Sequence, residues 1–376
     1  MAAAMGFGRF SYTPILPGMM TSLGLCAADA GLIASANFIG YLLGAISAGY
    51  GWGSGRERQV GLSALVATAV LLFAMGLTTS IVTFAVIRFL AGVASAFAMI
   101  FISSIVLGRA QATGDRNAPS LHFGGVGFGI AVSSILVFLL PEGGIGGFAL
   151  WQSAWFGGAA VAAAGALFVA ALLPRGSASA RSTPREKPLV WRRPLVVLML
   201  TYGLFGFGYV ITATFLVAMA RQGATDHLIE FLAWLVTGIS AALSIHLWRG
   251  AVPRIGVVGV YIVALGLEAV GLVLAVVLPL PAAPLVGGLL LGATFMIITA
   301  YGLQIGRGLA PESPRKIMAV MTAVFGVGQI VGPIVAGWMA AGGGGFAAPT
   351  LVAATVLFAC AVLVSVERRR IVAEIK

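Results

Sequence analysis

The segment 5–20, MGFGRFSYTPILPGMM, places one permanent charge, Arg9, in an otherwise apolar stretch. Arg9 is followed by Tyr12, Thr13 and Leu16 at the spacing i, i+3, i+4 and i+7. In a helix this spacing would put the four residues on one face. If the segment crosses a membrane, the charge costs about 2.5–3.5 kcal/mol and must face a cavity or a partner. A guanidinium fork binds carboxylates through paired hydrogen bonds. The stripe therefore predicts an anion site, although Arg9 could instead snorkel to the membrane surface.

Three other ionisable residues lie within long apolar runs. Arg88 could face the same cavity, or it could form a structural ion pair or hydrogen-bond to carbonyls at a helix end. Glu268 is deep in such a run, where its carboxyl could pack as a protonated group or exchange protons. His122 opens a glycine-rich run and could titrate near neutral pH, or it could simply lie at the interface near a span end.

The composition identifies the surroundings of these residues. Hydrophobic residues make up 60% of the 376-residue chain and charged residues 9%, whereas a soluble domain has roughly 25% charged residues. The apolar runs are about 20 residues long and do not alternate, which predicts membrane-spanning helices and excludes a barrel. The 52 glycines favour close packing of such helices. The two cysteines, Cys26 and Cys360, suggest neither a metal site nor a disulfide framework.

Turn-forming segments divide the chain into apolar runs that predict twelve transmembrane helices. The expected spans are 2–22, 29–50, 59–78, 81–108, 118–140, 148–173, 194–220, 228–248, 255–279, 284–306, 317–340 and 347–366. The polar segment 175–193 predicts a linker between two six-helix bundles, 1–174 and 194–376. The expected fold class is an all-α membrane protein of twelve helices in two pseudo-symmetric six-helix bundles.

The basic residues predict the orientation of this array. Nineteen of the 22 Lys and Arg residues fall in alternate loops, in the linker or in the C-terminal tail. Cytoplasmic loops collect Lys and Arg, so both termini are expected in the cytoplasm. The net charge of +11 is then a signal of topology, and no nucleic-acid partner is expected. The excess of Arg over Lys is typical of a GC-rich bacterial source, which indicates a bacterial inner (plasma) membrane.

An internal repeat relates the two halves. Gly6-Phe7-Gly8 recurs as Gly206-Phe207-Gly208 at an offset of 200, and Gly125-Val126-Gly127 recurs as Gly326-Val327-Gly328 at an offset of 201. Matches at nearly one offset in corresponding spans indicate a duplicated six-helix unit.

The repeat extends the polar stripe to the second half, since Tyr209 and Thr212 stand where the first half has Arg9 and Tyr12. The two stripes could oppose each other across a cavity. Substrate contacts are expected from seven residues: Arg9, Tyr12, Arg88, Tyr209, Thr212, Tyr301 and Gln329. Coupling or gating is expected from four: Glu268, His122, Gly127 and Gly328.

Two parallel six-helix halves joined by a basic loop resemble the major facilitator superfamily. RFLAGVASA, residues 88–96, is similar to the family's Arg-x-x-x-Gly pattern in the fourth span, and GVGQIVGP to its glycine-rich motif. The loop GYGWGSGRER lacks the Asp that the family carries between spans two and three. GFGRFSYTPILPGM and YGLFGFGYVITATFL resemble the YbfB/YjiJ-type branch. The resemblance implies substrate binding near the midplane with alternating access, and it matches Arg88 to an Arg linked to coupling.

Together these features predict a secondary active transporter for a small organic anion, driven by protons or by exchange for another anion. Efflux of lipophilic drug-like compounds is the first alternative, and a receptor on a transporter scaffold is the second. The glycine runs GVGFG and GVGQIVG lie within apolar spans with no preceding strand, so they do not predict nucleotide binding. No enzymatic activity, cofactor or metal is expected; the expected partners are the substrate, the lipid bilayer, and a proton or counter-anion.

Overall fold

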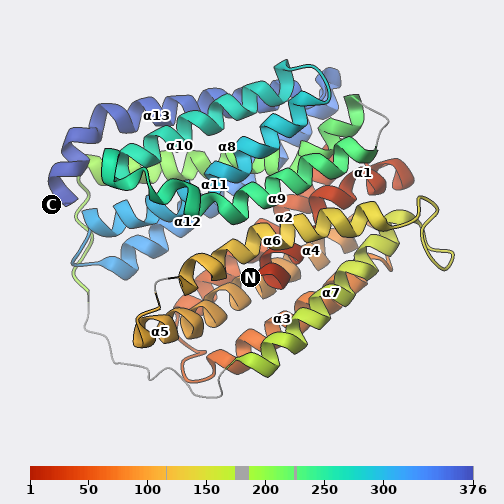
Figure 1. Ribbon diagram of the computed structural model, residues 1–376, viewed down its shortest axis with the longest axis horizontal. Coiled ribbons are helices and arrows are strands. Elements are labelled where there is room, and N and C mark those ends of the chain that lie inside the picture. The colour runs from red at the N-terminus through yellow and green to blue at the C-terminus, as the bar shows by residue number, and fades with distance from the viewer. Residues whose placement is uncertain (116, 174–185, 224–226, 376) are drawn as a thin grey trace.

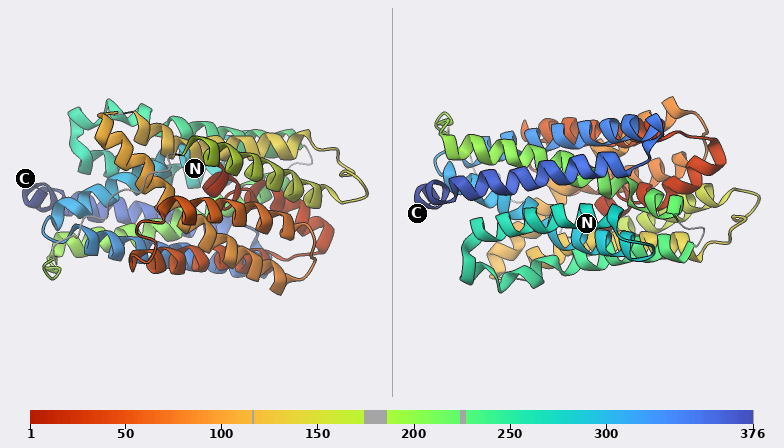
Figure 2. Two further views of the ribbon diagram at one scale, coloured as in Figure 1. Left: turned by 90° about the horizontal axis from the view of Figure 1, so that it is seen from below. Right: turned by 90° about the horizontal axis from the view of Figure 1, so that it is seen from above.

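The computed structural model describes residues 1–115, 117–173, 186–223 and 227–375, and its regular elements over these ranges are all helices. Figure 1 shows the helices up to α7 on one side of the molecule and those from α8 onward on the other. Most helices run roughly along the long axis, as the views from below and above also show (Figure 2). The predicted all-helical fold class is confirmed.

The elements follow the predicted spans in order. Those of the first half are η1 Ala2–Phe7, α1 Tyr12–Leu23, α2 Ala27–Gly49, α3 Glu57–Met75, α4 Ile81–Phe97, η2 Ala98–Ile102, α5 Ser103–Thr113, α6 Ala118–Leu139 and α7 Leu150–Leu172. Those of the second half are α8 Arg193–Gly223, α9 His227–Arg249, α10 Val252–Val277, α11 Ala282–Leu309, α12 Pro314–Met339, η3 Ala340–Gly344 and α13 Ala347–Ile375.

Over the described residues, eleven helices are long and apolar enough to cross a membrane, counting α4, η2 and α5 as one. The remaining predicted span, the first one at 2–22, is interrupted: the π-helix η1 ends at Phe7 and α1 begins at Tyr12. Pro14 contributes to this break, because it has no N–H to donate to the preceding turn and is best accommodated in the first turn of a helix. The last helix extends to Ile375, beyond the predicted end at 366.

The halves meet along three pairs of helices, α1 with α8, α2 with α12, and α6 with α9. Glycine permits two of these close approaches. A Cβ on Gly127 of α6 would overlap the backbone of Gly238 and Ala242 in α9, and a Cβ on Gly31 of α2 would overlap the Pro333 carbonyl in α12. The helix backbones therefore contact each other almost directly across the interface.

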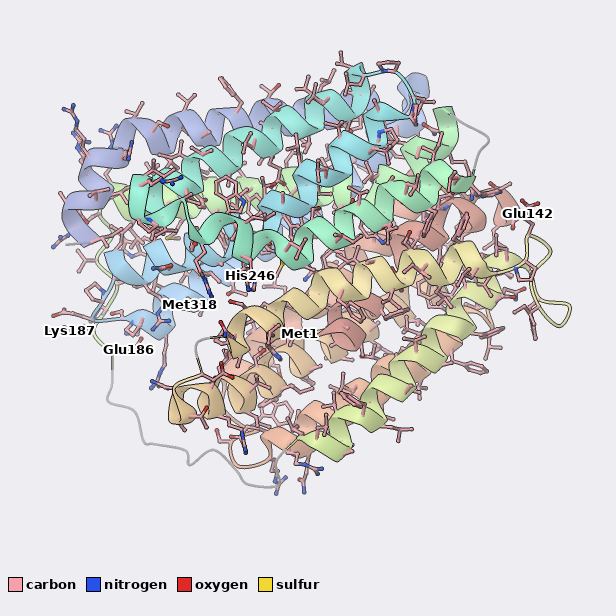
Figure 3. All side chains as sticks on the ribbon, in the orientation of Figure 1. Met1, Glu142, Glu186, Lys187, His246 and Met318 are labelled. Atoms are coloured by element: carbon pink, nitrogen blue, oxygen red, sulfur yellow. The ribbon has the colours of Figure 1, made fainter. Side chains whose placement is uncertain are left out.

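Hydrogen bonds between the halves lie mainly toward one end of the helices, although a longer one, from Arg249 Nη2 to Ser120 Oγ at 3.4 Å, lies near the opposite end. Ser35 Oγ donates to the Ile330 carbonyl at 2.8 Å, and Ser134 Oγ donates to the Phe231 carbonyl at 2.8 Å. The ring of Phe138 stacks on that of Phe231 with centroids 4.2 Å apart. This is the end that carries the loop with Glu142, whereas Glu186 and Lys187 lie at the opposite end (Figure 3).

The predicted linker 175–193 is described only from residue 186, and the rest of it lies outside the described residues. Its described part binds the second half. The carboxylate of Glu186 accepts hydrogen bonds from the backbone N–H groups of Arg315 and Lys316 at the start of α12, at 3.0 and 3.1 Å. The Lys187 carbonyl accepts from Ser313 Oγ at 2.6 Å. The boundaries 1–174 and 194–376 stay a prediction.

Candidate functional site

The break in the first span exposes backbone carbonyls, and Arg88 of α4 binds them. Its Nη1 donates to the Gly8 carbonyl at 3.0 Å and its Nη2 to the Arg9 carbonyl at 2.9 Å. The backbone over residues 8–11 forms a turn rather than a helix, so these carbonyls would otherwise lack partners. In this conformation Arg88 therefore holds the shape of the break, which is the structural alternative that its sequence position left open.

Tyr12 and Asn37 complete this arrangement inside the first half. Asn37 Nδ2 donates to the Arg88 carbonyl at 2.9 Å. The Tyr12 ring lies 5.1 Å from the Arg88 guanidinium carbon, and its hydroxyl donates to the Ala30 carbonyl at 3.0 Å. Tyr12 and Arg88, both expected as substrate contacts, thus bind each other and the protein backbone.

Arg9, by contrast, has a free guanidinium edge. Its side chain is 5% exposed, and its Nε and Nη2 have no hydrogen-bond partner among the described residues. Three aromatic rings surround its guanidinium carbon, with centroids at 4.6 Å for Tyr41, 4.7 Å for Phe38 and 5.6 Å for Phe10. Ring faces attract a cation but accept no strong hydrogen bond. The donors of Arg9 are therefore available to a ligand. Arg9 is buried inside the bundle, so the structure does not show it snorkelling.

The second half supplies an opposite wall around Tyr209 of α8. Gln329 Nε2 of α12 donates to the Tyr209 hydroxyl. The Tyr209 ring lies parallel to Phe295 at 5.8 Å and to Phe325 at 5.7 Å. Phe10, next to Arg9, meets Phe295 edge-on at 6.2 Å, which joins the two walls. We call this group of side chains from both halves the central cluster: Arg9, Phe10, Phe38, Tyr41, Tyr209, Phe295, Phe325 and Gln329.

The structure brings only part of the two polar stripes together. Arg9 and Tyr209 both belong to the central cluster, and the charge of Arg9 lies within electrostatic range of the Tyr209 hydroxyl. Beyond them the helices touch without an intervening cavity, because Thr13 Oγ1 donates to the Ala213 carbonyl at 2.6 Å. Thr212 is fully buried, and its hydroxyl has no partner among the described residues.

Glu268 lies on α10, outside the central cluster but close to it. The residue is fully buried, and its Oε2 accepts a hydrogen bond from Thr294 Oγ1 of α11 at 2.9 Å. Its Oε1 has no partner among the described residues. Thr294 immediately precedes Phe295, so one helix links this carboxyl to the wall around Tyr209.

Two predicted residues lie away from the central cluster. Tyr301 is half-buried further along α11, within range of the charge of Arg249. His122 lies inside the first half, where its Nε2 is 2.9 Å from Ser103 Oγ. It lines a separate cavity of about 460 Å³ together with Arg109. Neither residue reaches Arg9 in this conformation.

The two predicted gating glycines have different surroundings. Gly127 contacts α9 across the interface between the halves. A Cβ on Gly328 would instead overlap Gly203 and Phe207 of α8, within the second half. Gly328 therefore packs closely against α8 of its own half.

Sequence reasoning missed most of the aromatic lining. Phe10, Phe38, Phe295 and Phe325 are four of 22 phenylalanines in a chain of apolar helices, and nothing in the sequence sets them apart. Tyr41 was open to prediction, since it lies one turn from Asn37 and both are polar residues within a span. Over the described residues, no three His, Cys, Asp or Glu side chains come close enough to hold a metal ion.

Comparisons with known proteins agree with this architecture. A family model described as "Uncharacterised MFS-type transporter YbfB" matches residues 1–365. No match was found among curated proteins. The structure of the nucleoside transporter NupG (D323A mutant) superposes with a TM-score of 0.70 at 18% identity, covering 100% of this chain and 99% of that one.

Two further solved structures have the same fold. A bacterial homolog to the human lysosomal transporter Spinster, in an inward-facing and unoccupied conformation, gives a TM-score of 0.74 at 14% identity over 99% of this chain and 96% of that one. An auto-inhibited POT family peptide transporter gives 0.70 at 13% identity over 98% and 96%. The family match spans nearly the whole chain, and the helices form the same fold: the protein belongs to the major facilitator superfamily, in its YbfB-type family, and is a multi-pass membrane transporter rather than an enzyme.

Proposed function

We propose that the protein is a secondary active transporter for a small organic anion and that Arg9 binds the anionic group. The observation that carries this proposal is the buried guanidinium of Arg9, whose Nε and Nη2 have no partner among the described residues. An unpaired buried charge is costly, so a site of this kind is completed by a ligand of opposite charge. A carboxylate fits, since the guanidinium fork presents two parallel donors.

The charges around the site favour an anion over a cation. Buried acids elsewhere are already neutralised: Glu230 accepts from Arg221 at 2.7 Å, and Glu367 pairs with Arg193 at 2.8 Å. Glu268 is hydrogen-bonded to a neutral hydroxyl. Arg9 and Arg88 thus make the centre of the molecule positive, and a cationic ligand would be repelled.

Alternating access follows from the position of the central cluster between the halves. Three of the hydrogen bonds that join the halves lie toward the end with the Glu142 loop, and one longer bond, from Arg249 Nη2 to Ser120 Oγ at 3.4 Å, joins them near the opposite end. If the basic loops are cytoplasmic, with both termini in the cytoplasm of a bacterial cell, this is the outer end. The conformation is then closed to the outside, as an inward-facing or an occluded state would be. Rocking one half about the glycine contacts of Gly127 and Gly31 would open the other side.

Export of lipophilic compounds is a second candidate, and the aromatic rings of the central cluster favour it. Phe10, Phe295 and Phe325 offer apolar surface to a ligand of any charge. Arg9 separates the two candidates, because an anion needs its guanidinium and an uncharged lipophile does not.

The test is thermal stabilisation of the purified protein by succinate, benzoate and lipophilic cationic dyes. The proposal predicts that a carboxylate raises the melting temperature of wild type and does not raise that of Arg9→Gln. Arg58→Gln is the matched control, since Arg58 is a partly buried arginine that donates to the carbonyls of Ala170 and Leu173, away from the site. Stabilisation by dyes alone, or by carboxylates equally in Arg9→Gln, would reject the anion proposal and favour lipophile export.

A further inference from the structure

Glu268 differs from the other buried acids of the described residues. Glu230 and Glu367 each bind an arginine, through Arg221 and Arg193. Glu268 is fully buried, and among the described residues its one hydrogen-bond partner is the Thr294 hydroxyl at 2.9 Å, whose oxygen also lies 2.6 Å from the Leu290 carbonyl. Its Oε1 has no partner among the described residues. An ionised carboxylate without a counter-charge is costly in such a site, so Glu268 holds a proton in this conformation.

The groups that face Glu268 from neighbouring helices do not supply that counter-charge. From α8 the Tyr209 hydroxyl lies within range of the Glu268 charge, and from α11 the Thr294 hydroxyl is its hydrogen-bond partner. Cys360 of α13 lies near Tyr261, seven residues earlier on α10. The charged side chains of α13 lie in its C-terminal part, where Arg368 donates to the Ile255 carbonyl near the start of α10. The remaining ionisable side chains of α9 and α11 lie toward the helix ends: His227, Glu230, His246, Arg249, Tyr301 and Arg307.

A short path joins this carboxyl to the anion site. Thr294 precedes Phe295, whose ring is parallel to Tyr209 at 5.8 Å and meets Phe10 edge-on at 6.2 Å. The Tyr209 hydroxyl lies within range of the charges of both Glu268 and Arg9. A negative charge on Glu268 would therefore weaken the positive field that holds a ligand anion, and a proton on Glu268 would restore it.

We infer that Glu268 is the proton-carrying residue of a proton–anion symporter, a conclusion that rests on the anion site proposed above. In the outward-facing state the Glu268 carboxylate takes one proton from external water, and the anion then binds Arg9. Both cross together, because binding of each favours binding of the other. In the inward-facing state the anion leaves, and Glu268 returns its proton to internal water. One proton and one anion move per cycle, with no further reactant.

The proton itself is tested without any substrate, by infrared difference spectroscopy of reconstituted protein between acidic and alkaline pH. We expect a carbonyl stretching band of a protonated carboxyl that shifts in D2O, disappears at high pH and is absent from Glu268→Gln. Glu268→Asp should keep the band at a changed frequency, which covers the case of a poorly folded Gln variant. Glu367→Gln is the matched control and should keep the wild-type band. A band that survives in Glu268→Gln would overturn the inference.

Coupling is tested in liposomes with radiolabelled succinate and benzoate, in two modes. An imposed pH gradient should drive accumulation by wild type and not by Glu268→Gln, whereas exchange of labelled for unlabelled anion at equal pH should persist in both. Accumulation that is equal in the two proteins would overturn the role of Glu268 and leave the anion proposal standing. If wild type moves neither anion in either mode, the proposed function and its coupling both fail.

Discussion

Thr13 and Ala213 stand at equivalent positions of the sequence repeat, 200 residues apart, and the Thr13 hydroxyl donates a hydrogen bond of 2.6 Å to the Ala213 carbonyl. Both residues are buried. They lie four residues beyond Arg9 and Tyr209, the equivalent pair that contributes to the central cluster. The first helix of each half thus closes the site on one side by direct contact with its own counterpart, which is where a rocking motion of the halves must part them.

Replacing Thr13 by Val should favour separation of the halves at this end. The substitution keeps the shape of the side chain and removes a hydrogen bond worth about 1 kcal/mol, which changes a two-state equilibrium roughly fivefold. Electron-paramagnetic distance measurements between labels at Leu139 and Leu351, in a background without Cys26 and Cys360, would show a larger population of long distances. Thr113→Val is the control, since Thr113 is exposed and bonds its own helix. An unchanged distribution for Thr13→Val would show that this hydrogen bond does not set the equilibrium.

Arg9 and Arg88 should have opposite effects on stability. Removing Arg88 leaves the Gly8 and Arg9 carbonyls without their donors, at a cost of about 1–3 kcal/mol, so Arg88→Ala should melt at a lower temperature. Removing Arg9 relieves an unpaired buried charge, so ligand-free Arg9→Gln should melt at the wild-type temperature or above it. Differential scanning fluorimetry without added anion measures both.

The same two variants separate a ligand contact from a positioning residue. Arg9→Gln should lose its response to carboxylates, while Arg88→Lys, which keeps a donor, should regain part of both stability and anion response. If Arg88→Ala melted at the wild-type temperature and yet was not stabilised by anions, Arg88 would contact the ligand directly. Its role in holding the Gly8 and Arg9 carbonyls would then be excluded.

The spans were predictable because the length of an apolar helix is set by the thickness of the hydrocarbon layer. Contacts between helices were not, because they depend on register. The sequence repeat pairs Gly127 with Gly328. In the structure, the glycine of the second half that contacts the other half as Gly127 does is Gly326. Gly127 contacts α9, and Gly326 contacts Leu42 of α2, each across the interface between the halves. A shift of two residues turns a helix by more than half a turn, so a motif match cannot tell which glycine faces the other half.

The site was predictable to the extent that polarity marks it. Arg9, Tyr209 and Gln329 are polar residues in apolar spans, and the structure brings them together. The sequence left two roles open for Arg88, because it does not show whether the guanidinium is free or bound to carbonyls. The break at residues 8–11, which supplies those carbonyls, is known only from the structure. The phenylalanines of the lining carry no such mark.

Gly127→Ala should impair transport more than it impairs folding. A Cβ at this position would overlap the Gly238 and Ala242 backbone across the interface, so α6 and α9 could not approach as they do here. We expect uptake to fall severalfold and the distance between α6 and α9 to increase. Gly108→Ala is the control, because a Cβ there meets open space. Gly328→Ala should instead lower the melting temperature, since its overlap is with α8 of the same half. Normal uptake by Gly127→Ala would exclude this contact from gating.

The attachment of the linker should depend on pH through Glu186. Burial opposes ionisation of its carboxyl, but the N–H groups of Arg315 and Lys316 and the charges of their side chains outweigh burial and lower the pKa of Glu186 from its ordinary value of 4.5. A pKa that is lower when the linker is bound means that ionised Glu186 favours binding. The stabilisation of the bound linker by ionised Glu186 is complete above pH 4.5. It is lost as the pH falls through the lower pKa that Glu186 has when the linker is bound.

Hydrogen exchange of the Arg315 and Lys316 amides measures this attachment directly, because both donate to the Glu186 carboxylate. Their protection factors should be constant near neutral pH and should fall only below pH 4.5, the ordinary value. In Glu186→Gln they should be low and independent of pH across the same range. Glu312→Gln is the control: Glu312 pairs with Lys187, but both side chains are more than half exposed, and such pairs contribute little. Protection that persists in Glu186→Gln would mean that the fold of α12 alone, and not the linker, shields these amides.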